Sequence, residues 1–333
     1  MPVLDAQPHR ESTAMTDPTT DPTTEPPSAG GALAAAPRID AHHHLWDPAA
    51  RAHDWLDEPE LAPLRRPFTV DELRPQAAAA GIAGTVLVQT VTVADETPEL
   101  LAVAAADPLV RGVVGWTDLT SPGVADALAE LRELPGGERL VGVRHQVQSE
   151  PDPQWLLRPD VLRGLAAVAD AGLAYDLVVR PHQLAAATGA AARLPQLTFV
   201  LDHLGKPPIA VGGLAAWAGS LRAFAARPNT RGKLSGLVTE ADRRGWTTAD
   251  LRPCAEAALE CFGPERLMFG SDWPVCLLAA DYAEVVSAAE ELTAGLSGPE
   301  RGAVFGGTAA RVYGLAGDGP AGDGPAGDGP AGR

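Results

Sequence analysis

Short apolar runs alternate with longer, Ala-rich segments along most of the chain. Some of these runs are almost entirely apolar, as in TVLVQ (85–89) and TFVLDH (198–203). Such runs are typical of strands buried on both faces of a parallel sheet. We therefore expect eight strands, at Ile39–His44, Thr85–Gln89, Val110–Trp116, Leu140–Val147, Ala174–Val179, Leu197–His203, Gly232–Leu237 and Leu267–Ser271.

The segments between these strands have apolar residues three and four positions apart, which indicates helices that cover a sheet. Eight strand–helix units in about 280 residues match a (β/α)₈ TIM barrel in number and size. A doubly wound sheet is the alternative, but the chain contains neither GxGxxG nor GxxxxGK[ST]. We predict a single α/β barrel over residues 37–315, with helices that include Val124–Leu134, Pro159–Ala171, Leu184–Leu194, Leu214–Ala226, Leu251–Cys261 and Tyr282–Ala294.

The two ends of the chain differ in composition from this central part. Residues 1–36 are rich in Pro, Thr, Asp and Ser, and GDGPA occurs three times in tandem at 317–331. Segments of this kind bury too little apolar surface to offset the entropy lost on ordering. We predict disordered tails at 1–36 and 316–333, and the true start stays open between Met1 and Met15.

Charge and cysteine content exclude several classes of function. The net charge of −17 argues against nucleic acid as a partner and against docking on anionic membranes. No apolar run approaches the roughly 20 residues that a membrane span needs, and the first 30 residues do not resemble a secretory signal. Three cysteines suit a reducing compartment. We expect a soluble, cytoplasmic protein that acts on a small molecule.

Polar residues gather where the predicted strands end. Six of the eight histidines lie on or just beyond a strand end, which is where a parallel barrel places its active site. His42 and His44 are two positions apart on one strand, so both imidazoles point to the same face. Such a pair is half of a zinc-type site, because a catalytic ion needs about three protein ligands. His43 points to the other face and is left out of the ligand set.

Several motifs are similar to those of a known family. They are IDAHHHLWD (39–47), GVRHQVQSEPDPQWLLRP (142–159), FVLDHLGKPP (199–208), KLSGL (233–237), RLMFGSDWPVC (266–276) and FGGTAARVYGL (305–315). Together they resemble the amidohydrolase superfamily, and more narrowly its branch of sugar-lactone and muconolactone-type hydrolases. DHLGKP and FGSDWP in combination are specific to that branch. The resemblance covers residues 38–315.

The resemblance implies a metal site and two catalytic residues. His42, His44 and His182 would bind one divalent ion, most plausibly zinc, with Asp272 as a further ligand or as the general base. His203 would bind the metal or polarise the scissile group. The fourth strand has neither the lysine nor the glutamate that bridges two metals in other members, which argues against a binuclear centre. Some relatives hydrolyse lactones without a metal, so the ion is dispensable in part of the family.

We therefore predict a hydrolase that opens the lactone of a sugar acid by water attack. Candidate substrate contacts are Arg144, Lys206, Gln89, His145, Trp116 and Trp273. For Arg144 a structural salt bridge is an equal alternative, and for the tryptophans core packing is the alternative. A muconolactone-type hydrolase, a metal-dependent decarboxylase and an inactive barrel that binds a metabolite remain the rival hypotheses. The absence of GxSxG argues against a serine hydrolase, and a homo-oligomer is compatible with the sequence.

Overall fold

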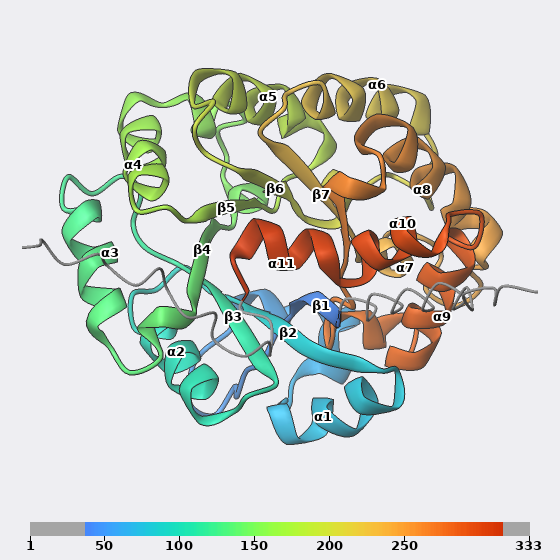
Figure 1. Cartoon of the computed structure of the whole chain (residues 1–333), viewed down its shortest axis with the longest axis horizontal. Coiled ribbons are helices and arrows are strands. Elements are labelled where there is room, and N and C mark those ends of the chain that lie inside the picture. Colours follow the sequence, from blue (N-terminus) through green and yellow to red (C-terminus); the bar gives the residue numbers. More distant parts are fainter. Residues whose placement is uncertain (1–36, 316–333) are drawn as a thin grey trace, which may run out of the picture. The chain divides into compact units, whose positions relative to one another are not determined.

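Eight parallel strands form one sheet in the order of the sequence, each pairing with the next (Figure 1). The computed structural model describes residues 37–315, and both predicted tails lie outside the described residues. The prediction of a (β/α)₈ barrel is confirmed, because a helix follows each strand and packs outside it. The strands are β1 Arg38–His43, β2 Ile82–Val88, β3 Val110–Gly115, β4 Leu140–His145, β5 Ala174–Leu177, β6 Phe199–Leu201, β7 Thr230–Leu234 and β8 Leu267–Phe269.

The last strand meets the first through backbone contacts just beyond the strand ends. His43 and Trp273 form a parallel bridge. The Asp272 N–H donates to the His42 carbonyl at 2.8 Å, and the His44 N–H donates to the Trp273 carbonyl at 2.7 Å. The seam between β1 and β8 is therefore fixed at the residues that carry the candidate chemistry.

The alternation of side chains along each strand creates two apolar clusters. Residues on the inner face, such as Ile39, Ala41, Val86 and Val88, pack together in the middle of the barrel. Their neighbours point outward and pack against the helices in a much larger cluster. Polar side chains such as Lys233 and Asp202 are also buried inside the barrel, next to this apolar layer.

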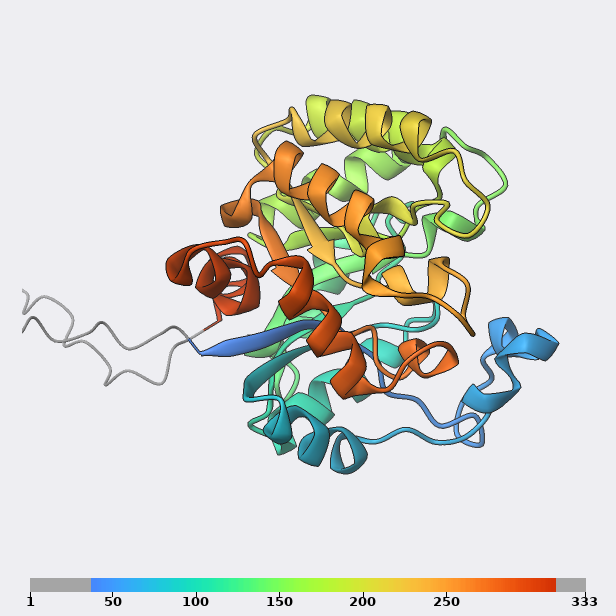
Figure 2. The same ribbon diagram turned by 90° about the vertical axis from the view of Figure 1, so that its right-hand side faces the viewer.

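Helices surround the barrel, and one of them lies across its amino-terminal end (Figure 2). Helix α11 overlaps the ring of strands in Figure 1, but Figure 2 shows it at the side of the barrel where β1 begins. Tyr313, its last residue, belongs to the inner apolar cluster. Figure 2 places the short helices η1 (Asp54–Asp57) and η2 (Pro59–Leu64) beyond the carboxyl end of β1. The α-helices are α1 Val70–Ala79, α2 Glu96–Ala106, α3 Val124–Glu133, α4 Pro159–Asp170, α5 Leu184–Arg193, α6 Leu214–Ala225, α7 Leu237–Glu240, α8 Thr248–Phe262, α9 Tyr282–Leu292, α10 Gly298–Gly302 and α11 Thr308–Tyr313.

The strands differ from the expected ones mainly at their carboxyl ends. The sixth was expected over Leu197–His203 but ends at Leu201, because the next residues form a tight left-handed turn, η7 (Asp202–Gly205). The fifth ends at Leu177, two residues early. Every helix expected from the sequence is present with small shifts at its ends. None of the described helices is long and apolar enough to cross a membrane.

Candidate active site

Two histidines at the end of β1 point into the barrel together. The Nδ1 atom of His44 lies 2.7 Å from the Val88 carbonyl, which only accepts, so the ring proton is on Nδ1 and the Nε2 lone pair is free. That Nε2 lies 3.1 Å from Nε2 of His42. His43 points the other way, as expected, and its Nε2 contacts the Thr85 hydroxyl at 2.9 Å. Burial lowers the pKa of His43 to about 3, so this ring is neutral.

His203 and Asp272 reach the same place from β6 and β8. Both have left-handed backbone conformations, with φ of 51° and 58°. Such a conformation costs roughly 1–2 kcal/mol for a residue with a side chain, and it turns the chain sharply after each strand. His203 then has its Nδ1 atom 2.9 Å from the Ser235 hydroxyl. The ring is neutral, because burial lowers its pKa.

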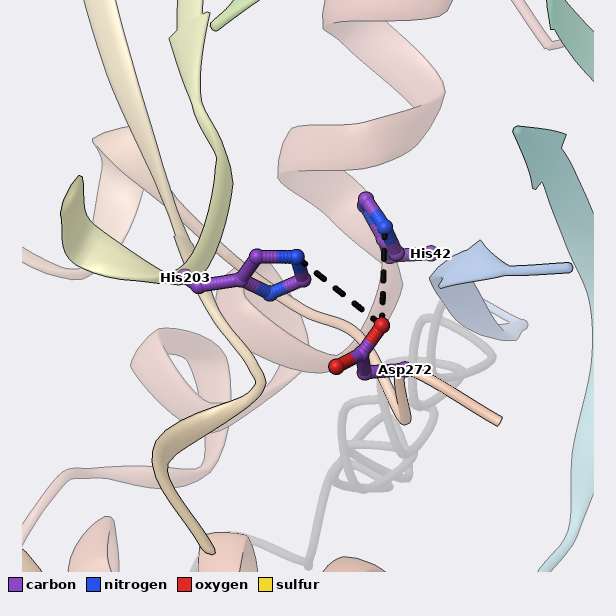
Figure 3. Close-up of side chains that lie close together, drawn as sticks. All are labelled: His42, His203 and Asp272. Atoms are coloured by element: carbon purple, nitrogen blue, oxygen red, sulfur yellow. Dashed lines mark ion pairs between the residues drawn. The ribbon is translucent and has the colours of Figure 1, made fainter. Parts of the chain in front are cut away.

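The Oδ1 atom of Asp272 lies close to all three inward-facing imidazoles. It is 3.6 Å from Nε2 of His44 and 3.8 Å from Nε2 of both His42 and His203. Figure 3 shows the approaches to His42 and His203. Although burial alone would raise the pKa of Asp272, the histidines, His203 foremost, hold it well below its usual range. The site is thus one carboxylate surrounded by three imidazoles.

A buried charge network lies behind His42. The Nδ1 atom of His42 faces Oδ1 of Asp202 at 3.2 Å and Nζ of Lys233 at 3.1 Å. Asp202 also pairs with Arg144 at 2.9 Å, and Lys233 pairs with Asp176 at 2.5 Å and with Asp202 at 3.0 Å. Burial favours the neutral form of Asp202, but Lys233 and His42 outweigh it and hold its pKa well below the usual range. The negative charges of the two carboxylates, Asp176 and Asp202, are therefore balanced by the positive charges of Lys233 and Arg144.

Two glycines leave room for these rings. A Cβ atom on Gly270 would lie 2.6 Å from Cβ of His42, and a Cβ on Gly236 would lie 2.5 Å from Nδ1 of His203. Both distances are shorter than any ordinary contact between such atoms. Each histidine thus occupies space that an alanine at the facing position would fill.

The structure does not bring His182 into this cluster. His182 lies in the short helix η6 (Pro181–Gln183), five residues beyond the end of β5, and its side chain is exposed. Within residues 37–315, the group with metal-compatible spacing is His42, His203 and Asp272, whose donor atoms lie within 4.8 Å of one another. His203 therefore stands where the sequence placed His182.

Three of the six predicted substrate contacts are used inside the protein. Gln89 and Arg144 are buried and bond to each other, since a guanidinium nitrogen of Arg144 lies 3.2 Å from the Gln89 side-chain oxygen. The Trp273 ring is fully buried and packs edge-on against Phe68. The salt bridge between Arg144 and Asp202 is the alternative that the sequence left open.

The other three predicted contacts are partly exposed. Trp116 donates its indole N–H to Nδ1 of His145 at 3.1 Å, and His145 contacts Glu150 at 2.7 Å through Nε2. The His145 ring also stacks on Trp155 with centroids 4.2 Å apart. Lys206 pairs with Glu240 at 3.1 Å. These side chains, which follow β3, end β4 and follow β6, remain the candidates for contact with a substrate.

Sequence reasoning missed the role of two buried residues beneath the site. Asp176 is the charged residue within the apolar strand β5, and it shares the inward side with Ala174. Tyr313 donates its hydroxyl to Asp176, with distances of 3.0 and 2.9 Å to the two carboxylate oxygens. The parity of Asp176 on its strand was a signal that could have identified it. No comparable signal pointed to Tyr313, because it arrives from the far end of the chain.

The donor atoms of the cluster suit a divalent ion. For zinc bound at about 2.05 Å, the ligands of a tetrahedron lie about 3.3 Å apart. The observed separations among His42, His44 and Asp272 are 3.1, 3.6 and 3.8 Å. Among the described residues, the ion-pair partners of Asp272 are these histidines and His203, so its charge has no lysine or arginine to balance it. Imidazole nitrogens with one carboxylate form a donor set that zinc accepts.

Fold and site together define a barrel hydrolase of the metal-binding type, and comparison with known proteins agrees. The amidohydrolase family model matches residues 39–315, and the chain belongs to that family. It is 43% identical over 289 residues to an L-fucono-1,5-lactonase of Burkholderia multivorans, covering 84% of this chain and 96% of the relative. It is 38% identical over 280 residues to an L-fucono-1,5-lactonase of Burkholderia ambifaria, covering 83% and 95%.

A solved structure is similar throughout the barrel. An amidohydrolase of Burkholderia multivorans, crystallised with bound zinc, superposes with a TM-score of 0.80 at 43% identity. The match covers 84% of this chain and all of the other chain. The predicted family is thus confirmed over the whole described part of the chain.

Proposed function

We propose that this protein hydrolyses the 1,5-lactone of a sugar acid, with L-fucono-1,5-lactone as the first candidate. The observation that carries the proposal is the position of Asp272, whose Oδ1 lies within 3.8 Å of three imidazoles at the carboxyl ends of the strands. The near full-length identity to two L-fucono-1,5-lactonases supports the choice of substrate.

His42, His44 and His203, together with Oδ1 of Asp272, would hold one divalent ion, for which zinc is the candidate. This assignment uses His203 as a ligand in place of His182, because His203 lies in the cluster and His182 does not. When bound, such an ion polarises the lactone carbonyl and makes a water molecule more acidic. A zinc-bound relative at 43% identity supports the choice of metal.

Asp272 moves the proton in the proposed reaction. Its pKa is held low by the histidines, so the group is ionised at neutral pH. All three short approaches of the imidazoles involve Oδ1, which leaves Oδ2 to take the proton of the attacking water. The water oxygen then bonds to the lactone carbonyl carbon, the ring C–O bond breaks, and Asp272 returns the proton to the leaving alkoxide. The product is the open hydroxy acid.

The charges around the site favour a neutral sugar lactone over a muconolactone-type substrate, which carries a carboxylate. Arg144, Lys233 and Lys206, the cations nearest to the cluster in the described structure, are each paired with an acid. Glu150 and Glu240 lie beside the partly exposed groups and suit hydroxyl donors. The three cysteines are free thiols, in keeping with the cytoplasmic location that we propose.

A panel of lactones tests this function. The purified chain is mixed with L-fucono-1,5-lactone, other aldonolactones, a muconolactone and a hydroxybenzoate, and acid release or loss of carboxylate is followed. We expect the sugar 1,5-lactones to be hydrolysed with the highest kcat/KM. Turnover of the muconolactone alone, or decarboxylation of the hydroxybenzoate, would replace the proposal with one of its rivals. No turnover of any compound would favour an inactive barrel.

A further inference from the structure

Lys233 is a charged side chain inside the barrel, directly below the candidate metal site. It is completely buried, and its ammonium lies between Asp176 on β5 and Asp202 after β6. A buried ammonium without counterions would cost several kcal/mol, so the two carboxylates fix its position. The chain has only two lysines, and this one is used where no solvent reaches it.

Asp202 connects this lysine to the candidate ligands. Its Oδ1 faces Nδ1 of His42 at 3.2 Å, beside the Lys233 ammonium at 3.1 Å from the same nitrogen, and its Oδ2 accepts from Arg144 at 2.9 Å. Of these two neighbours of Nδ1, only the carboxylate can accept a hydrogen bond. A histidine that binds a metal through Nε2 keeps its proton on Nδ1, and an acceptor at Nδ1 orients the ring and raises its basicity. Lys233 and Arg144 hold the Asp202 carboxylate from two sides, so this acceptor cannot turn away.

Tyr313 completes the chain of contacts from the opposite end of the barrel. Its hydroxyl lies 3.0 and 2.9 Å from the two oxygens of Asp176, and its ring centroid is 5.6 Å from Nζ of Lys233. Helix α11 thus packs against the apolar interior of the barrel, and its Tyr313 hydroxyl fixes the acid that holds the lysine.

We propose that Tyr313, Asp176, Lys233 and Asp202 are positioning residues that hold the His42 ring with Nε2 turned toward the metal position. The proposal rests on the metal site of the proposed function. It assigns helix α11, through Tyr313, a role in metal affinity.

Tyr313→Phe tests this role because it removes one oxygen atom and leaves the ring. Tyr175→Phe is the matched control, since Tyr175 lies on β5 beside Asp176, faces outward and has a buried hydroxyl without a partner in the described structure. Zinc affinity is measured by competition with a chelating dye, and thermal unfolding of the zinc-free proteins is recorded in parallel. Loss of a partner behind a ligand weakens metal binding by about 10–100-fold. We expect about tenfold for Tyr313→Phe, at the lower end because it acts through three intervening residues, and no change for the control.

Asp176→Asn is a second variant, which keeps an acceptor for Tyr313 but removes the charge that holds Lys233. We expect Asp176→Asn to weaken zinc binding at least as much as Tyr313→Phe does. If Tyr313→Phe does not fold, the zinc affinity of Asp176→Asn tests the inference in its place. Wild-type zinc affinity in a folded Tyr313→Phe or Asp176→Asn protein would overturn the inference, as would a wild-type protein that binds no zinc. Lactone turnover is measured separately. A chain that binds zinc less tightly in both variants yet hydrolyses no lactone would overturn the proposed function and leave this inference standing.

Discussion

Gly270→Ala should inactivate the enzyme through a steric effect on His42. The added Cβ would lie 2.6 Å from Cβ of His42 and 3.2 Å from Cβ of Ser235. Carbon atoms in contact are normally at least about 3.5 Å apart, so His42 would have to move by about 0.9 Å. Gly270 is not among the residues with positive φ, so the effect is purely one of contact.

Hydrogen bonds on both sides restrict movement of the His42 backbone. Its N–H donates to Asp40 at 3.1 Å, and its carbonyl accepts from the Asp272 N–H at 2.8 Å. The ring, which faces Lys233 and Asp202 on one side and His44 on the other, would shift with the backbone. A displacement of about 1 Å can cost around 10²-fold in rate, and overpacking costs roughly 1–3 kcal/mol of stability.

The assay compares kcat/KM for the best lactone with the melting temperature of the same preparation. Gly219→Ala in helix α6 is the control, because a Cβ there meets nothing within 4 Å. We expect a loss of about 10²-fold for Gly270→Ala and wild-type activity for the control. Activity within threefold of wild type in a folded Gly270→Ala protein would refute the argument that this glycine makes space for His42.

Three further predictions concern the site and its surroundings. Asp272→Asn should fold but lose about 10²–10⁴-fold in kcat; retained turnover would remove Asp272 as the proton acceptor. Protein purified without chelator should contain about one divalent ion per chain. Removal of this ion by a chelator should abolish lactone turnover, and added zinc should restore it. Full activity of the metal-free protein would contradict the proposed ligand role of the histidines. Burial lowers the pKa of the His145 imidazole, although the neighbouring Glu150 carboxylate opposes the shift. Below pH about 6.5 the imidazole therefore binds a proton more readily in the unfolded chain than in the folded one, and the free energy of unfolding falls as pH decreases. His145→Gln should flatten this acid side of the plot of melting temperature against pH, and an unchanged slope would exclude His145 as its source.

The strands and the shared face of His42 and His44 followed from the sequence because both depend on a period of two. That this face is the inner one depends on a register shift between Asp40 and His43, because Ile39 and Ala41 also pack inside the barrel and strict alternation would turn His42 outward. An apolar run identifies a buried strand, and parity then assigns each side chain to one face. The same parity would have placed Asp176 inside the barrel, next to the apolar layer. The family motifs added His203 and Asp272. The directions of these two side chains cannot be predicted from the alternation along a strand, because both residues lie in turns after the strands.

The third histidine of the cluster could not be chosen in this way. His182 and His203 both follow a strand, and the decision between them depends on how the chain turns. After β5 the chain continues for several residues before it turns, which carries His182 to the surface. After β6 a left-handed turn begins within two residues and directs His203 back over the barrel. Turn direction depends on tertiary contacts, such as the space above Gly236, that a single sequence does not reveal.

The left-handed residues connect the local strain of the chain to its chemistry. His203, Leu204 and Lys206 after β6 and Asp272 after β8 are the described non-glycine residues with positive φ. At roughly 1–2 kcal/mol each, these conformations persist only where surrounding contacts fix them. For Asp272 those contacts include its N–H bond to the His42 carbonyl, the same contact that closes the barrel between β8 and β1. The closure of the sheet therefore holds Asp272, the proposed proton acceptor, in place, and we expect a change that loosens this seam to impair the site before it unfolds the barrel.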